Sequence, residues 1–401
     1  MQLERKGGDK MATDNERDNQ PANLVEYRKK RKQKRMLTRL IIVLLIFTVI
    51  LIIAANFTTI IEPLRGFASR IDSKTSDDVG FPIKLPGSAS YSFDSFGDSF
   101  LLLTDTYLYT FGMNGGQNYA LRHGYSNPTQ CSNSKRILLY DKDYNNFSLY
   151  SKTSLIYSGS VEEKIVFASL SNNDVAAIVT NSDRYSNIIY IYNGSGEWRY
   201  TRKFINENVM NVEFSSEERY IYVSTIGVEN GEIYSAIYKY DITNESEAIW
   251  SYRLNSFSIP LLMHVNGGRV HIVYDNHAVS LSETDGTVIG ERAFPGTVLC
   301  GDFSDSIDAM VYTDSSTNRK VLVMLDSEME LLSTKSVNPN INRVVADGGN
   351  VYLVESGMLY GYNSQSEAIV EKPLFDDYVS FIKINNSVLL LGYNTVDIET
   401  I

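Results

Sequence analysis

The chain has 401 residues and a net charge of −11, enough length for one large domain or two ordinary ones. The charge is unevenly spread, because residues 1–39 carry 12 Lys/Arg against 6 Asp/Glu while the rest of the chain is strongly acidic. Proteins that bind nucleic acid replace phosphate counterions with Lys and Arg, so this acidic part argues against nucleic acid as a partner. The 27 Tyr and 17 Phe argue against a merely solvating, disordered chain.

A long apolar segment lies near the N-terminus, directly after a basic cluster at residues 28–39. Residues 40–61 form 22 consecutive positions without a charge, and a helix of that length spans roughly 33 Å, enough for the hydrocarbon core of a bilayer. A cleaved export signal, the main alternative, has a shorter apolar region of about 7–15 residues and a better cleavage site than the IAAN at 53–56. We therefore predict a transmembrane helix over residues 37–61.

The basic residues fix the expected topology, because positive charge flanking a membrane span stays in the cytoplasm. Residues 1–36 are predicted to be a disordered basic cytoplasmic tail, and residues 62–79, which have no sustained period, an extracytoplasmic spacer. The protein is thus expected to cross the cytoplasmic (plasma) membrane once, with residues 80–401 outside.

From residue 80 onward, short apolar runs alternate with Asn/Asp/Gly/Ser clusters, the pattern of many short strands. One unit, an apolar strand, a tight polar turn and a second apolar strand, recurs every 37 to 50 residues, about 41 on average. Equivalent positions are Phe100, Ile137, Ala176, Tyr220, Val270, Asp308, Val351 and Val388. A period of about 40–45 residues with four strands per unit is typical of β-propeller blades. We predict an all-β fold, an eight-bladed β-propeller over residues 80–401 preceded by the transmembrane helix. An array of β-sandwiches is the main alternative.

Closure of the ring is the next expectation. The eighth unit supplies only three strands before Ile401, and the segment GFPIKLPG at 80–87 is a candidate for its missing outer strand. Seven blades is the alternative count, if the irregular unit at 128–160 is an insertion.

The cysteines and histidines offer little chemistry. Cys131 and Cys300 are placed in opposite blades by the repeat, too far apart for a disulfide, so we predict two unpaired, buried thiols. His264 and His271 lie in one hairpin and are able to approach each other, but a packed or solvated position is expected rather than a metal site. The segment DKDYNN at 141–146 has alternating oxygen side chains but lacks the Gly and the distal Glu of a calcium loop, so a polar turn is expected.

The segment YDITNESEAIW at 240–250 resembles the repeat of quinoprotein-like propellers (the PQQ-like and WD40-like group), in Asp241, Thr243 and Trp250, with Asn244 where Gly is usual. Weaker echoes are NGSGEW at 193–198 and ETDGTVIG at 283–290. The overall layout also resembles a group of uncharacterised membrane-anchored propeller proteins of Gram-positive bacteria. Quinoprotein dehydrogenases commonly have a vicinal disulfide beside the quinone, and this chain has no adjacent cysteines.

Two function classes follow from this pattern. We expect a membrane-anchored, extracytoplasmic, non-catalytic binding or scaffold module of the bacterial cell envelope, without a metal or cofactor and without a nominated catalytic residue. Its partner is expected to be an envelope protein or a cell-wall polymer, read by loops near the channel mouth, where GVENGE at 227–232 is the longest insertion. The alternative is a propeller-type enzyme that acts on glycans, or a degenerate quinoprotein, with paired carboxylates facing an axial pocket.

Overall fold

Every described blade repeats the same local pattern. An apolar strand places its side chains alternately on the two faces of the sheet, and a turn then reverses the chain into the next strand. The computed structural model describes residues 80–88, 90–244, 247–338, 340–341 and 343–401. The predicted tail (1–36), transmembrane helix (37–61) and spacer (62–79) lie outside these residues. Within the described ranges, no helix is long and apolar enough to cross a membrane.

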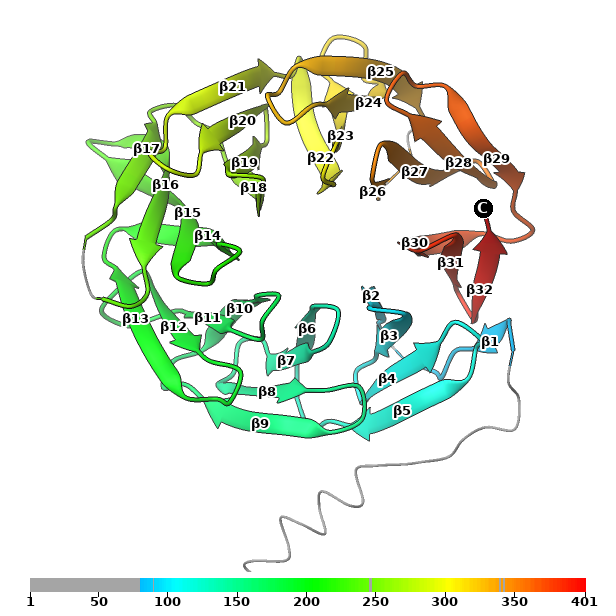
Figure 1. Ribbon diagram of the computed structural model, residues 1–401, viewed down its shortest axis with the longest axis horizontal. Helices are drawn as coiled ribbons and strands as arrows, with labels where there is room; N and C mark the ends of the chain where they lie inside the picture. Colours follow the sequence, from blue (N-terminus) through cyan, green and yellow to red (C-terminus); the bar gives the residue numbers. More distant parts are fainter. Residues whose placement is uncertain (1–79, 89, 245–246, 339, 342) are drawn as a thin grey trace, which may run out of the picture. The chain divides into compact units, whose positions relative to one another are not determined.

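The strands form eight four-stranded antiparallel sheets, which confirms the eight-bladed β-propeller (Figure 1). Blades 1 to 4 consist of β2 (Ser92–Phe96), β3 (Ser99–Leu103), β4 (Tyr107–Gly112) and β5 (Gln117–Arg122); β6 (Pro128–Ser132), β7 (Ile137–Asp141), β8 (Asn146–Tyr150) and β9 (Leu155–Ser160); β10 (Ile165–Leu170), β11 (Ala176–Thr180), β12 (Asn187–Tyr192) and β13 (Trp198–Phe204); and β14 (Glu207–Phe214), β15 (Tyr220–Glu229), β16 (Glu232–Asp241) and β17 (Trp250–Leu254).

Blades 5 to 8 continue around the ring with the same strand order. They consist of β18 (Pro260–Asn266), β19 (Arg269–Tyr274), β20 (His277–Ser282) and β21 (Val288–Ala293); β22 (Gly296–Phe303), β23 (Asp308–Asp314), β24 (Lys320–Leu325) and β25 (Leu331–Val337); β26 (Val345–Asp347), β27 (Asn350–Glu355), β28 (Met358–Asn363) and β29 (Ala368–Pro373); and β30 (Tyr378–Ile384), β31 (Ser387–Gly392), β32 (Thr395–Thr400) and β1 (Ile83–Lys84). The alternative of seven blades is wrong, because the irregular unit at 128–160 forms blade 2 in full.

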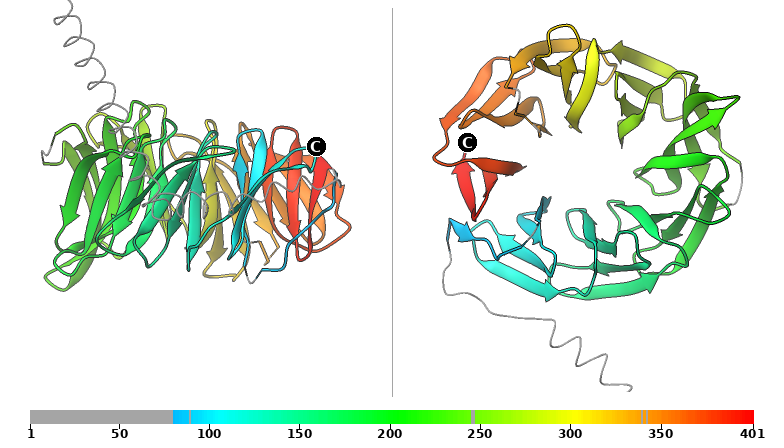
Figure 2. Two further views of the ribbon diagram at one scale, coloured as in Figure 1. Left: turned by 90° about the horizontal axis from the view of Figure 1, so that it is seen from below. Right: turned by 180° about the vertical axis from the view of Figure 1, so that it is seen from behind.

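The strands of each blade are called A to D from the central axis outward, and the innermost strands of the blades are arranged around that axis (Figure 1). Because successive strands are antiparallel, the A–B and C–D turns lie at one end of every blade, here named the turn face. The B–C loops and the D–A connections lie at the other end, named the loop face. The edge-on view in Figure 2 shows the strands of the propeller running between these two faces.

The ring closes through the N-terminal strand, as the sequence predicts. Ile83 and Lys84 pair with Val396 and Thr395 of β32, and the Leu85 N–H donates to the Asn394 carbonyl at 2.8 Å. Only two residues of the predicted segment 80–87 are strand, but its apolar side chains pack into a core shared by blades 8 and 1. This pairing joins the two ends of the described chain. It also covers the backbone hydrogen-bonding groups of β32, the C strand of blade 8, that would otherwise form an open sheet edge.

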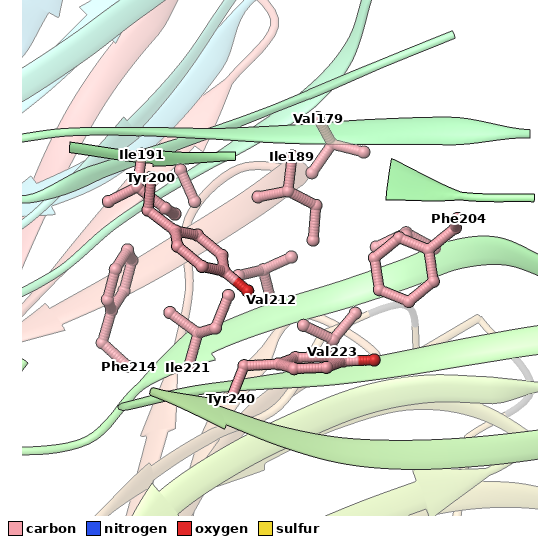
Figure 3. Packing of buried hydrophobic residues seen from close by; sticks show 12 residues of the cluster. Val179, Ile189, Ile191, Tyr200, Phe204, Val212, Phe214, Ile221, Val223 and Tyr240 are labelled. Carbon is pink, nitrogen blue, oxygen red and sulfur yellow. The ribbon is translucent and has the colours of Figure 1, made fainter. Parts of the chain in front are cut away.

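The core of the propeller lies between neighbouring blades. Between blades 3 and 4, the fully buried Val179 and Ile189 face Val212 and Val223, with Tyr240 beneath (Figure 3). Each such aliphatic side chain contributes roughly 1.5–3 kcal/mol through burial. Alternate side chains of a strand point to opposite faces of its sheet, so each blade presents apolar side chains to both neighbours. These apolar contacts hold the blades face to face.

Asp241, Thr243 and Trp250, the residues that resemble the quinoprotein-like repeat, have structural roles in and after the C–D turn of blade 4. The Asp241 carboxylate accepts hydrogen bonds from the Thr243 N–H (2.8 Å) and hydroxyl (2.5 Å), which closes the C–D turn of blade 4. The Trp250 indole N–H donates to the Glu283 carbonyl of blade 5 at 3.1 Å, and its ring lies against Gly286, whose φ of +73° and lack of a Cβ allow this approach. The motif therefore fixes a turn and joins two blades.

Candidate functional site

Hydrogen bonds between adjacent blades occupy many of the polar groups of the turn face. The Asn133 side-chain amide donates to the Ser171 carbonyl at 2.7 Å, joining blades 2 and 3. The same arrangement joins blades 6 and 7, where the Ser304 hydroxyl donates to the Gly348 carbonyl at 2.7 Å. These contacts hold the A–B turns in place and leave fewer of their polar groups for a ligand.

The loop face exposes more large apolar side chains in its loops than the turn face, where Ile249 in the C–D turn of blade 4 is exposed. Five of them lie in its loops and connections, namely Tyr144, Ile205, Phe257, Phe375 and Tyr393, and a sixth, Val228, lies near the end of β15. Phe375 is 93% exposed and Tyr393 72% exposed. Among the described residues, no exposed large apolar side chain lies in an A–B turn. Exposed aromatic and aliphatic side chains at loop tips are typical of surfaces that bind partners.

The B–C hairpin of blade 4 is the longest feature of this face. β15 and β16 have ten residues each, so the predicted insertion at 227–232 is seen as an extended hairpin. At its tip lies a cavity of about 410 Å³, lined in part by Glu229, Tyr234 and Arg253. The Arg253 guanidinium lies 3.7 Å from the centre of the Tyr234 ring and forms an ion pair with Glu229. Stacking and ion pairing together hold these side chains in one arrangement.

The innermost strands carry carboxyl groups that the sequence patterns do not single out. Glu213 on β14, half-buried, has its pKa raised to about 7 by desolvation. Asp302 on β22 has a pKa raised above its usual range, chiefly by burial and against the opposing hydrogen bond from the Ala346 N–H at 2.9 Å. Asp94 on β2 is close enough to Asp302 to add to that rise. Groups with raised pKa values suit proton transfer near neutral pH.

The two cysteines are unpaired, as predicted, and lie on the inner strands β6 and β22 of blades 2 and 6. Both residues are half-buried and not fully buried as predicted, because each lies on the innermost strand of its blade, which has a neighbouring strand on one side only. Burial still raises the pKa of both thiols above the usual range, and this keeps them protonated and unreactive at neutral pH.

The two histidines of the β18–β19 hairpin lie side by side, as the sequence predicts, and one of them contacts a carboxylate of the next blade. His264 and His271 are directly opposite in the β18–β19 ladder. His271 Nδ1 lies 2.5 Å from a carboxylate oxygen of Asp308 on β23, and both residues are buried. Within the described residues, no cluster of three or more His, Cys, Asp or Glu has the geometry to hold a metal ion.

The segment at 141–146 is a polar turn, as expected. The buried Asp141 carboxylate accepts the N–H groups of Ser126 (3.1 Å) and Asn127 (2.7 Å), and the Asn145 amide donates to the Glu162 carbonyl at 2.8 Å. The oxygen side chains therefore satisfy backbone groups of the loop face. They do not converge on one point.

The comparison with known proteins agrees with this architecture. Similar solved structures include BamB from Moraxella catarrhalis (10% identity, TM-score 0.56, covering 81% of this chain and 99% of that one) and the C-terminal WD40 domain of Sif2 (12% identity, TM-score 0.58, covering 81% and 99%). Sqt1 of Saccharomyces cerevisiae is similar at 12% identity and a TM-score of 0.57, covering 82% and 97%. At these identities the likeness shows the fold alone, a β-propeller. No curated protein matches the sequence.

A family model matches residues 75–401, which is nearly the whole of the acidic part of the chain. The match begins just before the described propeller and ends at the last residue. The chain therefore belongs to the family of unknown function DUF5711.

Proposed function

We propose that this protein is a membrane-anchored binding or scaffold module whose propeller lies on the extracytoplasmic side of a bacterial plasma membrane and binds an envelope protein through its loop face. The observation that carries the proposal is the set of exposed large apolar side chains on that face, with the extended blade 4 hairpin among them. The 22 uncharged residues at 40–61 and the basic cluster before them support the membrane placement.

The chemistry of the loop face indicates a polypeptide partner. Protein interfaces are centred on exposed aromatic and aliphatic side chains, surrounded by polar groups. Phe257, Phe375 and Tyr393 supply such side chains, and Asp376 and Asp377 supply acidic neighbours beside Phe375. A partner with apolar side chains among basic residues complements this surface.

Membrane placement is tested by labelling in intact cells. In a variant with Cys131 and Cys300 replaced by Ser, a single cysteine at the exposed Gln365 is expected to react with a membrane-impermeant maleimide. A single cysteine at Ser134 serves as a second reporter on the propeller. If both react only after the cells are lysed, the propeller is cytoplasmic and the proposal is wrong.

Partner binding is tested by purifying the tagged full-length protein from its native membranes. The double variant Phe257→Ala and Phe375→Ala is expected to lose a co-purifying protein that is present in stoichiometric amount with the parent. A matched double variant of rim side chains, Ile289→Ala and Leu331→Ala, is expected to keep it. Equal retention by both variants contradicts the loop-face assignment.

The carboxyl groups of the innermost strands favour a second candidate, an enzyme that acts on glycans. Glu213, with a pKa of about 7, has the protonation needed by a general acid, and Asp94 or Asp302 would supply the second carboxylate. Release of reducing ends from purified cell-wall glycan, abolished by Glu213→Gln, supports this candidate. Absence of release by the parent protein removes it.

A further inference from the structure

A groove of about 750 Å³ runs along the outer rim of the propeller, between the end of β9 in blade 2 and the outer strands of blade 3. Its lining differs from the exposed residues of the loop face and from the carboxyl groups of the innermost strands. The side chains that matter for its chemistry are Glu162, Tyr190, Tyr192, Trp198, Thr201 and Lys203. Its volume is in the range of roughly 300–1,000 Å³ found for small-molecule sites.

The strand register places the aromatic side chains on one wall. Tyr190 and Tyr192 are two residues apart on β12, so they share a face of the sheet. Trp198 is opposite Tyr192, and Thr201 is opposite Tyr190, on the neighbouring strand β13. Trp198 is 58% exposed, whereas the other tryptophan, Trp250, is 9% exposed. The groove therefore has an exposed indole at one end of a partly exposed aromatic wall.

This wall is already held in place without a ligand. The Trp198 indole N–H donates to the Thr201 hydroxyl at 2.9 Å, which fixes the orientation of the ring. The Tyr192 ring contacts Phe147 of blade 2 at 5.0 Å between ring centres. The turn before Trp198 contains Gly196, with φ of +84°, and an added Cβ there would lie 2.6 Å from the Tyr157 ring. A preorganised wall loses less side-chain entropy when a ligand binds.

The polar groups of the groove select the ligand class. The faces of aromatic rings carry negative charge density and attract the polarised C–H groups on the face of a sugar ring, while hydroxyl and charged side chains bind its hydroxyl groups. Glu162 brings a negative charge to the groove, and Lys203 and Arg202 bring positive charges, of which the Arg202 guanidinium is already paired with Glu247 at 3.3 Å. This mixture does not suit a polyanion, and its rings are interspersed with polar groups instead of forming the apolar centre of a protein interface.

We propose that this rim groove binds a neutral oligosaccharide, with sugar rings stacked on Trp198 and Tyr190 and their hydroxyl groups hydrogen-bonded to Glu162 and Lys203. The proposal is independent of the loop-face function, because the groove lies on the rim and uses different residues. Together the two sites would let one propeller contact a protein and a surface glycan.

The test uses the full-length protein in detergent and the fluorescence of Trp198. In a Trp250→Phe background, Trp198 is the only tryptophan of the chain. We expect at least one of three neutral probes, chitopentaose, cellopentaose or maltopentaose, to shift its emission saturably and to protect it from acrylamide quenching. Tyr190→Ala is expected to weaken binding at least tenfold, and Tyr190→Phe, which keeps the ring, to restore it. Phe375→Ala, an exposed aromatic on the loop face, is the matched control and should leave binding unchanged.

Calorimetry with the parent protein and Trp198→Ala provides a second readout that does not depend on the Trp250 background. Loss of the heat of binding in Trp198→Ala, with an unchanged melting temperature, supports the groove. The proposal is overturned if no probe binds the parent, or if binding is equal in Trp198→Ala and the parent. It is also overturned if the Trp198 signal responds to a purified protein partner but to none of the glycans.

Discussion

The substitution Glu213→Gln tests quantitatively whether the Glu213 carboxyl on β14 is desolvated. Desolvation raises the pKa of this carboxyl from 4.5 to about 7 in the folded protein. Between these two pH values the unfolded chain has released the proton while the folded chain still holds it. The free energy of unfolding of the parent therefore falls as pH rises through this window, by about 1.4 kcal/mol per pH unit and by about 3 kcal/mol in total.

Glutamine keeps the shape of the side chain but has no proton to lose. Glu213→Gln is therefore expected to have the same stability as the parent near pH 4 and to be more stable by about 3 kcal/mol at pH 8. The assay is urea unfolding of the full-length protein in detergent at several pH values, followed by tryptophan fluorescence. Glu232→Gln, on the exposed tip of the blade 4 hairpin, controls for the loss of one negative charge.

Two results would refute this reasoning. One is a difference between parent and Glu213→Gln that does not vary between pH 4 and pH 8. The other is a parent that gains stability relative to the variant as pH rises through this window, because that sign belongs to a carboxyl whose pKa is depressed by folding.

Three further predictions concern the joints of the ring. Ile83→Asp places a charge in the closing strand and should lower stability by about 2–4 kcal/mol, measured by urea midpoint; an unchanged midpoint would show that β1 does not close the ring. Gly286→Ala forces a Cβ within 2.6 Å of the Trp250 ring at a φ of +73°, with an expected loss of about 1–3 kcal/mol and altered Trp250 emission, and unaltered emission speaks against this contact. Asp308→Ala leaves the buried His271 without its carboxylate and should cost about 3 kcal/mol, less in Asp308→Asn; equal stability of parent and both variants counts against the pair.

The eight blades and their closure were predictable because they follow from patterns that are local in the sequence. An apolar strand, a polar turn and a second apolar strand recur at Phe100, Ile137 and six further positions, and the structure places each in a B strand. The missing outer strand of blade 8 was predictable for the same reason: the repeat requires four strands, and the chain ends after three. The closing strand is shorter than predicted, because only Ile83 and Lys84 form ladder pairs.

The candidate sites were predictable only in part, because they depend on which blades become neighbours. His271 was paired with His264 in the same hairpin, whereas its close partner, Asp308, is 37 residues further on, in the next blade. Glu213 is a charged residue in an apolar-alternating strand, and this was the one sign in the sequence of an unusual carboxyl group. The sequence does not show which residues surround that carboxyl group or how far it is desolvated. The loop-face residues, such as Phe375, are single apolar positions in connections, and only the ring brings them to one side.

The most direct test of the loop-face proposal is site-specific photo-crosslinking in living cells of the native host. A benzophenone amino acid is placed at Phe257 and Phe375 on the loop face, and at Ser134 and Asn385 in A–B turns on the turn face. The account predicts one discrete protein adduct from both loop-face positions and none from the turn-face positions. Adducts from the turn face alone, or the same adducts from both faces, would contradict it.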